Sequence, residues 1–240
     1  AAVVNVTDSG GSSGDLKDRF VILPPGDLLK CILALSKHEG ARELLLKRIR
    51  NPFCSGHTGG NIMLLGMQKV YGGLQPAIDA LCQLLSVQGR VLPVSLSQSF
   101  LCAEYEDHSV YRGETSVDIG VHEGKRIARL FLDPSISTTD EVLKVISEAD
   151  VFCVGPGSFY TSVMPNFLSE GVKSAMGESK GKIIYIANLL TEGKGMQGFL
   201  LDDIVGLAEH HIGRKVDWVV ANHHLPSDGE LIDRYAMENK

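Results

Sequence analysis

The chain has 240 residues, of which 44% are hydrophobic and 22% are charged, and its formal net charge at pH 7 is -6. This composition is ordinary for a soluble globular protein, excludes a globally disordered chain and argues against nonspecific nucleic-acid binding. No apolar run is long enough to span a membrane and no signal peptide stands at the start, so we expect a cytoplasmic protein. Five cysteines, odd in number and far apart, favour reduced core thiols over disulfides or a metal site.

A loop rich in glycine and hydroxyl groups follows the first predicted strand, which covers residues 2–6. The loop residues that could contact a ligand are Asp8, Ser9, Gly10, Gly11 and Ser12. Ligands of open parallel sheets bind where the strands end, so this loop is a candidate binding site. The same composition also suits a flexible linker, but a carboxylate directly after a strand favours the binding interpretation.

Helices are expected to dominate the next part of the chain. Asp27 is placed to cap a helix over about 28–37, which is the simplest role for this residue on its own. A second amphipathic helix is predicted over 41–50, with basic residues in its last turn, where cations suit the helix dipole. Another apolar helix is predicted over 74–86, with a proline in its first turn.

His57 and Asn61 form a second candidate binding pair. A helix starting near His57 would place both side chains one turn apart on one face, where both could reach one ligand. Glycines at positions 59 and 60 are unfavourable in a helix, which favours a close approach of another group to the backbone. A lone histidine at a helix start is just as typical of a cap or a solvated side chain.

Residues 90–133 differ from the rest of the chain in their pattern of apolar and polar residues. Short runs of β-branched and aromatic residues alternate with polar turns, of which 106–108 has the character of a hairpin turn. We expect a single α/β domain over 1–240 with a β-rich insertion at about 90–133. This insertion could cover one side of a binding crevice or only extend the edge of the sheet.

The central feature of the sequence begins at residue 151, where four apolar residues predict a parallel strand buried on both faces at the centre of the sheet. Gly155 and Gly157 follow and can adopt positive φ, which lets a ligand approach the main chain. A helix start beyond them would favour a bound phosphate or carboxylate. Hydroxyl groups next to these glycines come from Ser158, Thr161 and Ser162. The alternative is a tight turn with hydroxyl caps.

The remaining elements continue the α/β order. Thr138 and Glu141 have the spacing of a capping box for a helix that ends just before residue 150. Strands are predicted over 182–188 and 216–222, with a helix over 199–212 between them and a terminal helix over 231–240. Each of the two strands ends in asparagine, and Asn188 lies at the same level of the predicted sheet as the glycine loops.

The loops taken together resemble the YvcK-like branch of the CofD/YvcK family, whose members are called gluconeogenesis factors. The matching stretches are 8–14, 24–27, 55–61 and 155–166, the last of which ends in Asn166. The resemblance implies a Rossmann-like three-layer fold with a mainly parallel sheet and a phosphorylated ligand. It also implies a contact from Tyr235. Members normally begin with an earlier strand and glycine-rich phosphate loop, which we expect to be absent from this sequence, and extend beyond the terminal helix.

Two functions are compatible with this resemblance. In the first, a regulatory protein binds a UDP-sugar, notably UDP-N-acetylglucosamine, or another phosphorylated small molecule, with roles in central carbon metabolism, cell shape and envelope synthesis. Its phosphate would lie at Gly155, Gly157 and Ser158. In the second, a CofD-type 2-phospho-L-lactate transferase uses Asp8 or Asp27 to hold Mg²⁺ over the phosphates of a nucleotide, with His57 as a base. No catalytic residue or resident cofactor is assigned, and homo-oligomerisation is left open.

Overall fold

A computed structural model describes residues 1–7, 26–49, 56–122, 125–189, 196, 198–224 and 229. Two parallel sheets form its framework. In the first sheet β1 (Ala2–Val4) pairs with β2 (Val91–Pro93). The second sheet has the order β6-β7-β8, made of β6 (Val151–Val154), β7 (Lys182–Ile186) and β8 (Trp218–Val220). Parallel pairing with helical connections confirms the predicted α/β class.

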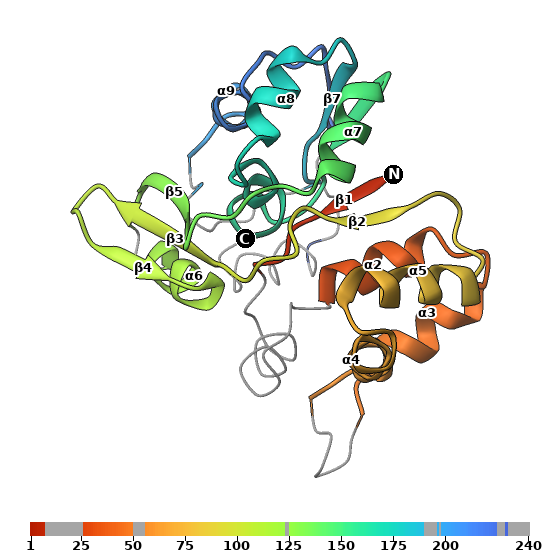
Figure 1. The fold of residues 1–240 in the computed structure, drawn as a ribbon. Helices are drawn as coiled ribbons and strands as arrows, with labels where there is room; N and C mark the ends of the chain where they lie inside the picture. The colour runs from red at the N-terminus through yellow and green to blue at the C-terminus, as the bar shows by residue number, and fades with distance from the viewer. Residues whose placement is uncertain are drawn as a thin grey trace.

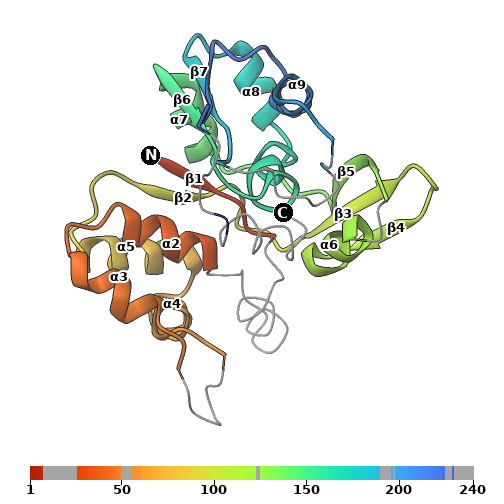
Figure 2. The same ribbon diagram turned by 180° about the vertical axis from the view of Figure 1, so that it is seen from behind.

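Helices lie beside both parallel sheets. In Figures 1 and 2 the β1-β2 pair runs between a helical group, α2 to α5, and the layer that contains β7 and α7 to α9. The first group consists of α2 (Gly26–Ala34), α3 (Glu39–Leu46), α4 (Gly59–Tyr71) and α5 (Leu74–Leu84). The second consists of α7 (Asp140–Glu148), α8 (Val172–Glu178) and α9 (Leu201–Ile212). The buried apolar positions recur at helical spacing, as Leu28, Leu29, Ile32 and Leu33 do in α2.

Strand β6 lies at an edge of its sheet, so the prediction of a central strand covered on both faces is wrong. Among the described strands it pairs only with β7. Val151 is 51% exposed and Cys153 is exposed, whereas Val154 is buried. Cys153 is therefore not the core thiol that its apolar setting predicted. A short apolar run indicates a strand but does not specify how many neighbours cover it.

The antiparallel unit is built from three strands and one helix. Its sheet has the order β4-β3-β5, from β4 (Val110–Arg112), β3 (Phe100–Tyr105) and β5 (Ile127–Asp133). The predicted hairpin turn between β3 and β4 is confirmed, with His108 at positive φ. The sequence did not predict α6 (Glu114–His122), which Tyr105 ties to the sheet by donating a hydrogen bond from its hydroxyl to the Val117 carbonyl at 2.6 Å. β2 pairs with β1 and not with this unit, and the division of the chain into domains stays a prediction.

Two short helices follow the glycine loop in place of one regular helix. A π-helix, η1 (Phe159–Val163), leads directly into a 3₁₀-helix, η2 (Met164–Phe167). The helix expected beyond the two glycines therefore begins as a π-helical turn. The apolar residues Phe159, Tyr160 and Met164 are buried, which draws the turn into the core before regular α-helical geometry starts.

Candidate functional site

Gly155 gives the loop after β6 its shape. Its φ is +89°, in the left-handed region, and a Cβ at this position would lie 2.6 Å from the carbonyl oxygen of Ile186. Only glycine can make this approach to the end of β7. Gly157 does not have the positive φ that the sequence suggested, but a Cβ there would lie 3.1 Å from a methyl group of Val163. The space around Gly157 is thus limited by side-chain packing.

Asn188 holds the glycine loop in place from the end of β7. The Gly157 N–H donates to Asn188 Oδ1 at 3.0 Å, and Asn188 Nδ2 donates back to the Gly157 carbonyl at 3.0 Å. This pair of hydrogen bonds uses both side-chain functions of Asn188 and the one amide of Gly157. Asn188 is therefore a residue that positions the loop. Because the Gly157 amide already donates to Asn188, it cannot also donate to a bound anion.

Hydrogen bonds within the turn order its hydroxyl-bearing residues. The amides of Ser162 and Val163 both donate to the Ser158 carbonyl at 2.9 Å, and Asn166 Nδ2 donates to the Ser162 carbonyl at 2.8 Å. The amides of Tyr160 and Thr161 come before these first helical hydrogen bonds, where the main chain of a helix has no partner of its own. Residues 155–166 contain no charged side chain, so anion recognition here depends on main-chain and hydroxyl donors.

A second strand end meets this turn. Asn5, which follows β1, is 2% exposed, and its Nδ2 donates to the Thr161 carbonyl at 3.5 Å, the long end of hydrogen-bonding distance. Asn5 Oδ1 accepts from the Thr7 amide at 3.1 Å and from the Thr7 hydroxyl at 2.9 Å. The chain that leads to Asp8 therefore starts beside η1. Asn5 and Thr7 were not predicted as site residues, although an asparagine within an apolar strand is a recognisable signal.

Asp27 and His57 have other surroundings than expected. Asp27 is the second residue of α2, not the residue before it, and its carboxylate accepts from Lys30 Nζ at 2.8 Å. Thr58 caps α4 by accepting from the Asn61 amide at 3.2 Å, so His57 precedes the helix and does not share one of its faces with Asn61. The carbonyl of His57 accepts from the Ile49 amide at 2.8 Å.

Several predicted site residues lie outside the described part of the chain. They are Asp8, Ser9, Gly10, Gly11, Ser12 and Tyr235. Among the residues that the structure does describe, no group of three or more His, Cys, Asp or Glu side chains is placed to hold a metal ion. Nor does any helix in the described ranges have the length and apolar character needed to cross a membrane.

The fold and the loops define an α/β protein with a candidate anion-binding turn at the ends of its parallel strands. Comparison with known proteins identifies the family to which the chain belongs. The family model described as 2-phospho-L-lactate transferase CofD matches residues 1–240, and the chain belongs to this family.

Relatives and solved structures agree with this assignment. A putative gluconeogenesis factor from Thermotoga maritima is 40% identical over 238 residues, which cover 99% of this chain and 74% of that protein. The gluconeogenesis factor of Bacillus subtilis is 35% identical over 242 residues, covering 99% and 75% of the two chains. A crystal structure of a UPF0052-family protein from Bacillus halodurans matches with a TM-score of 0.90 at 36% identity, over 99% of this chain and 76% of that one. The predicted Rossmann-like α/β fold and the family resemblance are confirmed.

Proposed function

We propose that this protein is a gluconeogenesis factor that binds a nucleotide sugar of the UDP-N-acetylglucosamine type and acts as a regulator. It would regulate central carbon metabolism, the synthesis of the cell envelope and cell shape. The names of the relatives support the first part of this role. The ligand class is supported by the turn after β6, which offers main-chain and hydroxyl donors to phosphate oxygens.

The contact between Asn5, which follows β1, and Thr161, in the turn after β6, is the observation that carries the proposal. It brings the end of β1 and Thr7, the residue before the 8–14 loop, next to the turn at 155–162. A nucleotide sugar is long and carries two phosphates, so it needs donors from more than one loop. We place the phosphates at the turn and the remainder of the ligand towards Asp8.

The chemistry of the turn favours binding over catalysis. Main-chain amides and hydroxyl groups stabilise anions, but they do not act as a general base at neutral pH. His57, the base suggested by the sequence, is not part of this turn but precedes α4. We therefore rank recognition of the ligand above its conversion.

Calorimetric titration of the full-length protein with UDP-N-acetylglucosamine tests the proposal. We expect binding that weakens at least tenfold in Asn188→Ala, because the two hydrogen bonds that hold Gly157 are lost. Asn222→Ala is the matched control: Asn222 also follows a strand, but within the described ranges its side chain bonds to the main chain of His224, at 2.8 and 3.1 Å, and not to the glycine loop. Its affinity should be unchanged. No measurable binding by the wild-type protein at millimolar ligand would refute the proposal.

A CofD-type phospholactyl transfer is the second candidate, favoured by the family description. Here Mg²⁺ would bind to one carboxylate and to phosphate oxygens of a nucleotide donor. Asp8 is the better candidate ligand, because the Asp27 carboxylate is already paired with Lys30. Magnesium-dependent product formation from a deazaflavin acceptor, lost in Asp8→Ala, would support this function. Absence of turnover with that acceptor would count against it.

A further inference from the structure

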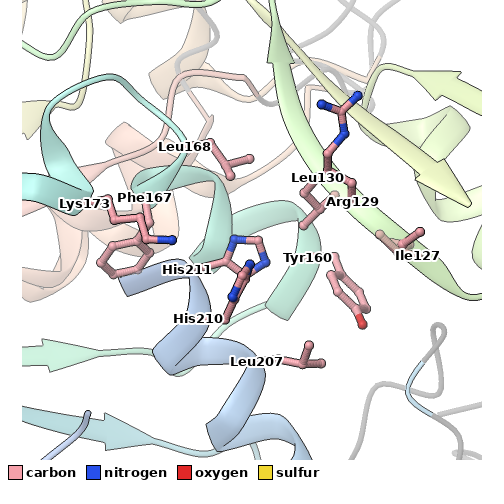
Figure 3. A pocket seen from close by; sticks show the side chains of 11 residues that line it. Ile127, Arg129, Leu130, Tyr160, Phe167, Leu168, Lys173, Leu207, His210 and His211 are labelled. Atoms are coloured by element: carbon pink, nitrogen blue, oxygen red, sulfur yellow. The ribbon is translucent and has the colours of Figure 1, made fainter. Parts of the chain in front are cut away.

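A cavity of about 250 Å³ lies between the antiparallel unit and the helices α8 and α9 (Figure 3). β5 forms one wall, η1 and η2 form a second, and the helices supply the third. The residues that line it are Ile127, Ala128, Arg129, Leu130, Tyr160, Phe167, Leu168, Lys173, Leu207, His210 and His211. Tyr160 also belongs to the turn at 155–162, but its side chain faces this cavity, and the other lining residues lie outside the glycine loop and the asparagines that position it.

The lining combines apolar walls with nitrogen donors and contains no carboxylate. The side chains of Lys173, His210 and His211 make no hydrogen bond or ion pair with the residues that the structure describes. Figure 3 shows the two imidazoles between Lys173 and Tyr160. The guanidinium of Arg129 points away and is bound to Glu104 at 3.1 and 3.2 Å, so it does not contribute a donor.

Lys173 and His210 are exposed and His211 is half-buried, but neighbouring groups restrict all three side chains. Gly213 ends α9 with a φ of +95°, and a Cβ there would lie 2.8 Å from Cγ of Lys173, so the lysine stem packs directly on this glycine. The rings of His210 and His211 contact each other edge to face, with centroids 5.5 Å apart. An ammonium group and two imidazoles thus share one rim of an otherwise apolar cavity.

Protonation states at neutral pH suit donation to an anion. Burial lowers the pKa of His211 to about 4, helped by the charges of His210 and Lys173, so its imidazole is neutral and offers one N–H. Burial also raises the pKa of Tyr160 to about 12, so its phenol stays protonated. Lys173 supplies the positive charge that an anionic group needs when it leaves water.

We propose that this cavity is a second ligand site, which takes a small organic anion with an apolar body. The anionic group lies at Lys173 and the histidines, and the body packs against Leu130, Phe167 and Leu207. At about 250 Å³ the cavity is smaller than the roughly 300–1,000 Å³ that is typical of sites for drug-sized ligands, which favours a single ring or a branched chain over a nucleotide sugar. The bound molecule links the antiparallel unit to the α8–α9 layer.

Benzenesulfonate is a suitable probe because it carries one ring and one permanent negative charge. We expect it to shift the imidazole NMR signals of His210 and His211 in the wild-type protein, with a dissociation constant in the millimolar range or below. Sulfate, which lacks the ring, and benzyl alcohol, which lacks the charge, should bind at least tenfold more weakly. Unperturbed imidazole signals at high millimolar probe would overturn the proposal without any variant.

Variants separate this site from the one proposed for a nucleotide sugar. Lys173→Met keeps the stem on Gly213 but removes the charge, and should weaken benzenesulfonate binding at least fivefold. Lys180→Met is the control, since Lys180 is an exposed lysine beyond α8 that lines no part of the cavity. Unchanged affinity in Lys173→Met, or displacement of the probe by UDP-N-acetylglucosamine, would overturn the assignment. Failure of the nucleotide sugar to bind at all would affect only the proposed function.

Discussion

At the scale of single residues, two asparagines organise the strand ends where a ligand is expected. Asn188 binds both the amide and the carbonyl of Gly157, and Asn5 connects the end of β1 to the turn that contains Thr161. Both side chains use a donor and an acceptor at once, which neither aspartate nor leucine could do. The geometry of the proposed phosphate-binding turn therefore depends on amide side chains more than on charged side chains.

Gly155 offers a test of the loop geometry at this scale. Gly155→Ala should lower the free energy of unfolding by about 2 kcal/mol or more, because alanine resists positive φ and its Cβ would meet the Ile186 carbonyl. Gly177→Ala is the matched control within α8, where a Cβ has open space and helix propensity predicts a gain of up to about 1 kcal/mol. Urea denaturation measures both. Equal stability of Gly155→Ala and the wild type would contradict the loop geometry.

At the scale of elements, helix starts differ from their predicted positions by one or two residues. Thr139, and not Thr138, caps α7: it has extended backbone and its hydroxyl accepts from the Val142 amide at 3.3 Å. The Thr138 hydroxyl instead donates to Ser169 at 2.9 Å inside the protein. Similarly, α3 ends at Leu46, so the basic residue Lys47 follows its last turn. Sequence spacing identifies a capping region, while the backbone conformation decides which residue caps.

The cap of α7 can be tested directly. Thr139→Ala should lower the free energy of unfolding by about 1 kcal/mol, because one amide of the first turn loses its acceptor. Thr139→Ser keeps the hydroxyl group and should stay within a few tenths of a kcal/mol of the wild type. Thermal unfolding followed by circular dichroism compares the three proteins. Wild-type stability of Thr139→Ala would contradict the assignment of the cap to this residue.

At the scale of the whole molecule, buried hydroxyl groups connect the antiparallel unit to the parallel framework. The Ser99 hydroxyl donates to the Pro134 carbonyl at 2.7 Å, and the Ser95 hydroxyl donates to the Ser137 carbonyl at 2.8 Å. Ser169 continues the series by donating to the Ile136 carbonyl at 3.1 Å. These bonds hold the segment between β5 and α7 in place. They therefore hold β5, which forms one wall of the proposed ligand cavity, against the walls formed by η1, η2, α8 and α9.

Acid should destabilise the folded protein partly through His211. Its folded pKa of about 4 lies below the ordinary 6.5, so the unfolded state binds more protons between these values. The stabilising contribution is complete above pH 6.5 and is lost as the pH falls towards 4. After allowance for the solvent that still reaches the ring, we expect a loss of about 1 to 2 kcal/mol.

Urea unfolding of the wild type and His211→Gln at several pH values between 4.5 and 7.5 measures this contribution. The stability difference between the two proteins should change over this window in favour of the variant as the pH falls. An NMR titration of the same ring gives an independent check. A His211 imidazole that titrates near 6.5 in the folded protein would contradict the expectation.

Apart from α6 and the two short helices after the glycine loop, most strands and helices, the hairpin and the glycine loop could be predicted from the sequence, because periodicity and turn chemistry are local properties. The family resemblance added the Rossmann-like fold. The neighbours of β6, the exposure of Cys153 and the roles of Asn5 and Asn188 could not be predicted in this way. They depend on which distant segments meet, and a short apolar run or a single amide side chain does not encode its partner.

The sequence by itself thus determined the class of fold and where along the chain the loops rich in glycine and hydroxyl groups lie. Only the tertiary structure decided that residues 5 and 161 meet, that residue 188 occupies the amide of residue 157, and that a separate cavity forms beside α8 and α9. The reason is physical: local pattern fixes the conformation of a segment, whereas a site is made by donors from several segments whose contact depends on the packing of the whole core.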